Sequence, residues 1–309
     1  MTANWPPPAE PQRWATIEFR AMASPCRIVT DDVELAEEGH RLVKTLEQRW
    51  SRFIASSEVS AINRAAGELC IVSRETYHLV ELAEAARCAT GGVFNPLVLD
   101  RLELIGYNAP GQLNESAERL TPSPVTRQPI ELYPDVSAVR LPLGSRLDPG
   151  GIGKGLAGDL VADALIELGA ERAQIELGGD VRLVGSHWMS EEWAVDVRDP
   201  RERNRIIARL EMPAGAIATS STLGRAWRRG NLDVHHVIDP MTGLPSDTDL
   251  NAVTVIADRL WWAEIIAKAA LISGSDEAEA MLRRHGVTGL IVHCDGEITV
   301  VDDATRLAA

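Results

Sequence analysis

Residues 173–184 read AQIELGGDVRLV and predict two short strands joined by a tight turn. The apolar runs Ala173 to Leu177 and Val181 to Val184 flank Gly178-Gly179-Asp180, and paired glycines are typical of hairpin turns. Further strands are expected at Trp193 to Val197 and Ile206 to Leu210. Because the connections here are too short for crossover helices, these strands are expected to pair antiparallel.

Helices and further strands are expected on both sides of this stretch. Apolar residues recur at helical spacing from Asp32 to Trp50, and similar patterns predict helices elsewhere. The other expected helices lie near 56–64, 74–89, 153–168, 261–273 and 276–285, and the other expected strands near 15–22, 27–30, 139–143, 146–147, 252–257, 289–293 and 298–301. Interleaved antiparallel strands and helices predict an α+β fold of antiparallel sheets flanked by helices.

The domain organisation is expected to be simple. Residues 1–14 are rich in proline and predict a disordered leader, and residues 15–309 are expected to form one large α+β domain or two fused lobes. The weakly patterned, proline-dotted region 108–134 is the candidate hinge between lobes.

Composition excludes several classes of protein. The formal charge of -14 and the pI near 5.0 argue against a general nucleic-acid binder, which needs clustered basic residues. Arg225, Arg228 and Arg229 form the densest basic run, which is either a solvated face or a grip on a phosphate. No apolar stretch approaches 18 residues, so membrane insertion is not expected.

The cysteines indicate a reducing compartment. Cys26, Cys70, Cys88 and Cys294 are widely spaced and include no CxxC pair. Residues 1–13 lack the apolar segment of a secretory signal peptide. We therefore expect reduced thiols and a cytoplasmic protein.

A glycine-rich turn, Asp148-Pro149-Gly150-Gly151-Ile152-Gly153-Lys154-Gly155, precedes an expected helix. Backbone N–H groups at a helix start can hold a phosphate. The spacing matches neither a Walker A loop nor a dinucleotide fingerprint. By itself, the turn is either a phosphate site or a tight connection into the helix.

Two other groups of residues carry reactive side chains. His236 could act as a general base with Asp239 as its orienter or acid partner, although Asp239 also fits an Asx-type turn. Glu264 and Lys268 lie four apart on an otherwise apolar helix. They form either an ordinary intrahelical ion pair or part of a buried functional site.

These features, taken in order, resemble the ApbE family of FAD:protein FMN transferases. The resemblance covers at least seven segments from Met22 to Gly274, about four-fifths of the chain. The matching segments are 22–27, 51–53 with 57–63, 92–96, 148–155, 176–180, 216–220, 236–243 and 263–268. The resemblance implies tandem lobes similar to the T-fold, with FAD bound between them.

The resemblance also assigns roles to individual residues. It implies that Met22, Phe53 and Val93-Phe94-Asn95 line the flavin nucleotide, with the aromatic rings supplying stacking surface. Asp148, Lys154 and Val237 are implied FAD contacts, and His236 stands at the position of the catalytic histidine. The implied metal-binding positions are the Gly151 carbonyl, Glu264, Ala267 and Lys268.

Three positions depart from the family pattern. Asn95 replaces the usual Asp, and Ser221 stands where Gly commonly follows Thr-Ser. Glu264 and Lys268 replace an Asp and a Thr that ligate the metal, and an ammonium cannot ligate Mg²⁺. Either Glu264, the Gly151 carbonyl and FAD phosphates hold Mg²⁺ with added water, or Lys268 itself supplies the positive charge.

The activity that the resemblance implies is transfer of FMN from FAD to a Thr or Ser hydroxyl of an acceptor flavoprotein, with release of AMP. An FAD pyrophosphatase would use the same site with water in place of the hydroxyl. A non-catalytic FAD-binding protein is the third alternative.

Overall fold

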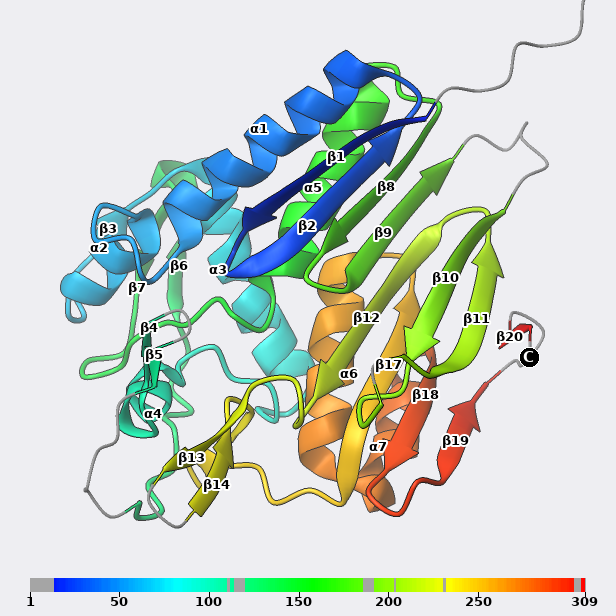
Figure 1. Ribbon diagram of the computed structural model, residues 1–309. Helices are drawn as coiled ribbons and strands as arrows, with labels where there is room; N and C mark the ends of the chain where they lie inside the picture. The colour runs from blue at the N-terminus through cyan, green and yellow to red at the C-terminus, as the bar shows by residue number, and fades with distance from the viewer. Residues whose placement is uncertain are drawn as a thin grey trace, which may run out of the picture.

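An eight-stranded antiparallel sheet runs through the centre of the computed structural model (Figure 1). The structure describes residues 14–109, 112–113, 120–185, 192–202, 204–229, 232–302 and 307–308, so the expected leader lies outside them up to residue 13. The strands follow the order β1 (Ala15–Ala21), β2 (Ser24–Thr30), β8 (Arg172–Leu177), β9 (Asp180–Gly185), β12 (Gly215–Ser221), β17 (Leu250–Ala257), β18 (Thr288–His293) and β19 (Ile298–Val301). Every neighbouring pair is antiparallel, as the short connections predicted.

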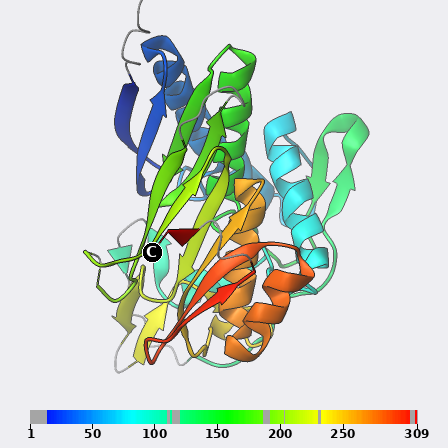
Figure 2. The same ribbon diagram turned by 90° about the vertical axis from the view of Figure 1, so that its right-hand side faces the viewer.

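Four helices pack on one face of this sheet, as the two views together show (Figures 1 and 2). They are α1 (Val33–Trp50), α5 (Gly153–Glu167), α6 (Leu260–Ser273) and α7 (Ser275–Arg284). Asp32 caps α1 by accepting hydrogen bonds from the N–H groups of Glu34 and Leu35. The helices and strands share one core, in which Ile28, Leu165 and Ile265 are completely buried.

A smaller sheet covers the other face of the central strands. β10 (Trp193–Arg198) and β11 (Ile206–Met212) form a hairpin that pairs with β20 (Leu307–Ala308). Leu210 of β11 joins Leu183, Ile217 and Ile256 of the large sheet in a second core. The middle of the large sheet is therefore buried on both faces, which explains its continuous apolar runs.

The two halves of the large sheet repeat one order of elements. The first half follows β1, β2, α1, α5, β8 and β9, and the second follows β12, β17, α6, α7, β18 and β19. The fold class is thus confirmed as α+β with antiparallel sheets in a tandem arrangement.

Each half carries one long insertion. The first insertion, residues 51–152, separates α1 from α5, and the second insertion, residues 222–249, separates β12 from β17. The first contains α2 (Glu58–Arg64), β3 (Cys70–Ile71), α3 (Arg74–Ala89), α4 (Leu99–Leu104), β4 (Tyr107–Ala109), β5 (Gln112–Leu113), β6 (Glu131–Tyr133), the 3₁₀ turn Pro134–Val136 and β7 (Ala138–Arg140). The second contains β13 (Ala226–Arg229), β14 (Leu232–His235), β15 (Ile238–Asp239) and β16 (Leu244–Pro245).

Most local predictions agree with the structure, and one strand was wrong. Gly178 and Gly179 form the expected turn, with φ angles of 68° and 95° that suit glycine. The strand expected at Arg146-Leu147 is absent from the described structure. Instead, the Asn63 side chain bonds both backbone groups of Leu147, at 2.7 Å from its N–H and 2.9 Å from its carbonyl. The role of residues 108–134 as a hinge stays a prediction.

The structure also bears on the expectations about thiols and membrane-spanning segments. All four cysteines are free thiols. Among the helices of the described residues, none combines the length and apolar character that a bilayer crossing requires.

Candidate functional site

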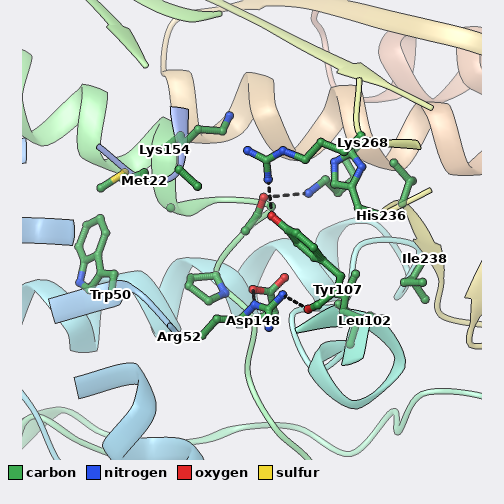
Figure 3. A pocket seen from close by; sticks show the side chains of 18 of the residues that line it. Met22, Trp50, Arg52, Leu102, Tyr107, Asp148, Lys154, His236, Ile238 and Lys268 are labelled. Atoms are coloured by element: carbon green, nitrogen blue, oxygen red, sulfur yellow. Dashed lines mark hydrogen bonds and ion pairs between the residues drawn. The ribbon is translucent and has the colours of Figure 1, made fainter. Parts of the chain in front are cut away.

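A cavity of about 360 Å³ lies where the two insertions meet the start of α5 and one side of α6 (Figure 3). Most of the predicted site residues line it, namely Met22, Phe53, Val93, Phe94, Asn95, Asp148, Gly151, Lys154, His236, Val237 and Lys268. Glu264, Ala267 and Asp239 do not line it. In the view of Figure 3, Met22 and Trp50 lie at one end and His236 and Lys268 at the other.

One wall of the cavity is aromatic. The rings of Phe53 and Tyr107 meet edge to face with centroids 6.0 Å apart, and the Arg52 guanidinium lies 4.2 Å from the Phe53 centroid. Arg52 also pairs with Asp148 at 3.2 Å, where both side chains are largely buried. Together these groups form a rigid wall whose planar surfaces suit a flat heterocycle.

Asn95 has a structural reason to differ from the usual Asp. Its Nδ2 donates to the Thr126 carbonyl at 3.0 Å, and its Oδ1 accepts from the Leu97 N–H at 2.9 Å. An ionised carboxylate has no hydrogen to give to the Thr126 carbonyl. The amide therefore fixes the loop that carries Phe94, whose own N–H donates to Thr90 Oγ1 at 3.1 Å.

Glu264 and Lys154 tie the start of α5 to both halves of the sheet. Glu264 Oε2 accepts the Gly155 N–H of the first turn of α5 at 2.8 Å, which satisfies a free donor and suits the positive end of the helix dipole. Lys154 Nζ lies 3.2 Å from Glu264 Oε1 and also pairs with Asp180. Asp180 in turn accepts the Thr219 N–H of β12 at 3.1 Å.

Lys268 does not form the intrahelical ion pair that its spacing allows. Its Nζ donates to the Gly150 carbonyl at 3.2 Å, and in the described chain its ammonium has no carboxylate within ion-pair distance. Burial lowers the pKa of Lys268, while the charges of Glu264 and Asp148 raise it. The ammonium thus lies between the glycine-rich turn and the cavity.

The surroundings of His236 favour its neutral imidazole form. Burial, followed by the charges of Lys268 and Arg225, lowers the pKa of His236 well below 6.5. Nδ1 of His236 is buried, and no hydrogen-bond partner for it exists among the described residues. An imidazole that is neutral near pH 7 is free to accept a proton.

Asp239 is not positioned to orient His236. Its carboxylate accepts the Met241 N–H at 2.8 Å and the Thr242 hydroxyl at 2.9 Å. This is the Asx-type turn that the sequence also allowed. The two hydrogen bonds of its carboxylate support a role for Asp239 in the turn. Among the described residues, no contact supports a role in proton transfer.

Two further residues line the cavity: Arg225, for which the sequence left a phosphate grip and a solvated face open, and Tyr107, to which it gave no role. Arg225 Nη1 donates to the Tyr107 hydroxyl at 2.8 Å and Nη2 to Ser24 Oγ at 3.3 Å. The basic run is split by the fold, because Arg228 is exposed near Asp233 and Arg229 is buried away from the cavity. The run was a usable signal for Arg225, but no pattern pointed to Tyr107.

The four predicted metal-binding positions do not form an open oxygen-ligand site. Both Glu264 oxygens have partners, Ala267 is buried outside the cavity, and the Lys268 ammonium occupies the space beside the Gly150-Gly151 backbone. A Cβ at position 151 would lie 2.6 Å from Lys268 Nζ. Within the residues that the structure describes, no cluster of three His, Cys, Asp or Glu side chains could hold a metal either.

Comparison with known proteins shows the family of the chain. The model of the ApbE family matches residues 22–291. The chain belongs to the ApbE family. An FAD:protein FMN transferase from Klebsiella pneumoniae is 32% identical over 248 residues, covering 76% of this chain and 75% of the relative. Another from Treponema pallidum is 28% identical over 281 residues, covering 85% and 78%.

The ApbE fold extends over nearly the whole chain. A crystal structure of the ApbE protein from Thermotoga maritima superposes with a TM-score of 0.84 at 28% identity, covering 94% of this chain and 97% of the other. The resemblance inferred from the sequence motifs is thereby confirmed. The relatives are transferases, so the enzyme class expected for this ApbE chain is confirmed as well.

Proposed function

We propose that this chain is an FAD:protein FMN transferase that moves FMN from FAD to a Thr or Ser hydroxyl of an acceptor flavoprotein. The observation that carries the proposal is the His236 imidazole, whose buried Nδ1 has no partner among the described residues and which shares one aromatic-walled cavity with Lys268 and Arg225. A base, fixed cations and a planar binding surface are the parts that this transfer requires.

The chemical step follows from these groups. The acceptor hydroxyl oxygen forms a bond with the FMN-side phosphorus of FAD, while the bond from that phosphorus to the bridging oxygen breaks and AMP leaves. His236 receives the hydroxyl proton. Lys268 and Arg225 stabilise the negative charge on the phosphoryl oxygens, and they cost no reorganisation because the protein already fixes them.

Binding should favour the whole dinucleotide. The aromatic wall suits the isoalloxazine ring, and the three cations Lys154, Arg225 and Lys268 lie where a pyrophosphate and its AMP half could be gripped. We expect FAD to bind more tightly than FMN in a fluorescence titration. Equal affinities for FAD and FMN would contradict the proposal that the cavity binds both the FMN and the AMP halves of FAD.

One incubation separates the proposed transfer from its alternatives. FAD is mixed with the enzyme and a candidate flavoprotein acceptor, and the products are analysed by mass spectrometry. FMN covalently attached to the acceptor supports the transferase. Free FMN together with AMP indicates an FAD pyrophosphatase, and unchanged FAD indicates a binding protein without turnover.

The partner is defined only by its chemistry. It is a flavoprotein with an accessible Thr or Ser hydroxyl, and the net charge of -14 gives no reason to invoke nucleic acid. A cytoplasmic location remains the prediction from the cysteine pattern.

A further inference from the structure

We infer that the Lys268 ammonium is a tethered cation that takes the place of a divalent metal ion, so that this enzyme transfers FMN without Mg²⁺. The inference assumes the proposed FMN transfer, in which a cation beside the phosphates is needed. The evidence for it is the position of Lys268 against the glycine-rich turn.

Two of the groups that would attract a metal ion, the Gly150 carbonyl and the Glu264 carboxylate, already have partners from the protein. Lys268 Nζ bonds the Gly150 carbonyl at 3.2 Å and lies against the Gly151 Cα. Glu264, the carboxylate nearest along α6, is bound by the Gly155 N–H at 2.8 Å and by Lys154 at 3.2 Å. A metal ion at this place would have to displace both lysines.

The remaining carboxylate at this end of the cavity is also neutralised. Asp148 pairs with Arg52 at 3.2 Å, and their side chains are only 12% and 5% exposed. A largely buried pair of this kind is costly to break, because the partner is left as an uncompensated charge. Asp148 is therefore a poor substitute ligand. Among the described residues, Lys268 and Arg225 are the cations that face the cavity without a carboxylate partner.

The choice of lysine at position 268 is informative because lysine is rare in this chain. The sequence contains 31 Lys and Arg residues, of which only Lys44, Lys154 and Lys268 are lysines. An ammonium is a compact point charge, whereas a guanidinium is a broad planar fork. The space beside Gly151 is narrow, since a Cβ there would also lie 2.8 Å from the Phe94 ring. A compact ammonium suits this narrow space better than a broad guanidinium would.

The surroundings of Lys268 act on its charge in opposite directions. Burial lowers the pKa of Lys268, as do Lys154 and Arg225, while the charges of Glu264 and Asp148 favour the ammonium form. A bound pyrophosphate adds negative charge beside Nζ, so binding of FAD should raise the pKa of Lys268 and hold the ammonium form.

The first test measures metal binding without turnover. Mn²⁺ is added as a paramagnetic probe for Mg²⁺ to the full-length protein loaded with FAD, in the absence of acceptor, and free Mn²⁺ is measured by electron paramagnetic resonance. Wild type should bind no more Mn²⁺ than free FAD does. Lys268→Thr removes the ammonium and adds a hydroxyl ligand, so it should gain one Mn²⁺ site. Lys44→Thr is the matched control and should behave as wild type.

The second test measures FMN transfer in EDTA and in Mg²⁺. Wild type and Lys44→Thr should be equally active in both. Lys268→Thr should lose activity in EDTA by about 10²–10³-fold, the loss expected for one preorganised electrostatic group, and regain it in Mg²⁺. Stoichiometric Mn²⁺ binding by wild type, or a wild-type requirement for Mg²⁺, would overturn the inference, as would the failure of Lys268→Thr to bind Mn²⁺.

A third measurement needs only the wild-type protein and covers the case in which Lys268→Thr does not fold. With ¹⁵N-labelled lysine, three side-chain signals are expected. The Lys268 ammonium signal should persist at pH 7 with FAD and should not move when Mg²⁺ is added. A shift or loss of that signal on addition of Mg²⁺ would refute the tethered cation. An absence of FMN transfer under every condition would refute the proposed function instead, and the metal-binding results would still decide the role of Lys268.

Discussion

The two halves of the large sheet share one scaffold but contribute different chemistry. Both follow two strands, two helices and two strands, yet the first insertion contains 102 residues, from 51 to 152, and the second only residues 222–249. The first supplies Phe53, Tyr107 and the loop of Phe94, to which we assign binding of the flavin. The second supplies Arg225 and His236, to which we assign the chemical step.

The difference between the two insertions explains how a repeated scaffold can form a single asymmetric site. β12 lies four strands from β1 in a wholly antiparallel sheet, so both strands point the same way and their far ends share one edge. The β1–β2 turn at Met22 and the start of the second insertion therefore face the same cavity. Substitutions in the first insertion should change affinity, and those in the second should change rate.

His236→Ala should give the largest effect on rate. Loss of a general base typically slows a reaction by about 10²–10⁴-fold, and FAD affinity should change little because the base acts in the transition state. The transfer rate and a flavin-fluorescence titration measure the two quantities separately. His78→Ala, at a half-exposed site on α3, is the matched control. A loss below about tenfold would remove His236 from the role of base.

The pH dependence of kcat/KM should reflect the environment of His236. Its pKa is lowered well below 6.5, so the neutral base persists down to that lower pKa and is lost only as the pH falls through it. The acid limb of the profile should therefore lie well below pH 6.5, with about a tenfold loss for each further pH unit. Arg225→Gln should move the limb to higher pH, since it removes a charge that depresses this pKa. A wild-type limb near pH 6.5 or above would contradict the assignment.

Asp180→Asn tests the junction between the halves. Asn keeps an acceptor for the Thr219 N–H but loses the charge that pairs with Lys154, and hydrogen bonds to charged groups contribute about 1.5–3 kcal/mol. We expect the free energy of unfolding, measured with urea, to fall by that amount. Asp163→Asn removes an exposed pair with Arg259 between α5 and α6 and should cost about 1 kcal/mol or less. Equal losses for the two variants would mean that the Asp180–Lys154 pair stabilises the fold no more than the exposed Asp163–Arg259 pair does.

Phe53→Leu should give the smallest effect and should appear in affinity. Leucine keeps much of the apolar volume but loses the ring, and aromatic pairs add about 0.5–1.5 kcal/mol beyond burial. The dissociation constant for FAD should rise by about two- to tenfold while kcat stays close to wild type. Phe19→Leu, on β1 and outside the cavity, should leave both unchanged. A larger fall in kcat than in affinity would contradict the assignment of binding to the first insertion and of the chemical step to the second.

Local patterns predicted the regular elements well because their signals are local. Period, turn glycines and capping residues identified α1, α3, α6 and the β8–β9 hairpin within a few residues. The strand at Arg146-Leu147 was wrong because Asn63, distant in sequence, satisfies the Leu147 backbone. The short α4 was missed, since six residues give too little periodicity to detect.

For the site, the sequence by itself determined the family, the α+β class and most of the residues that line the cavity. Residue types and their order were sufficient, since ordered motifs survive without any knowledge of distances. Only the tertiary structure decided the partners. It placed Glu264 on the Gly155 N–H and Lys268 on the Gly150 carbonyl, it kept Asp239 in a turn, and it brought Arg225 to Tyr107. Spacing along one helix shows which groups can meet, but the choice among partners depends on burial and charge contributed by segments far apart in the chain.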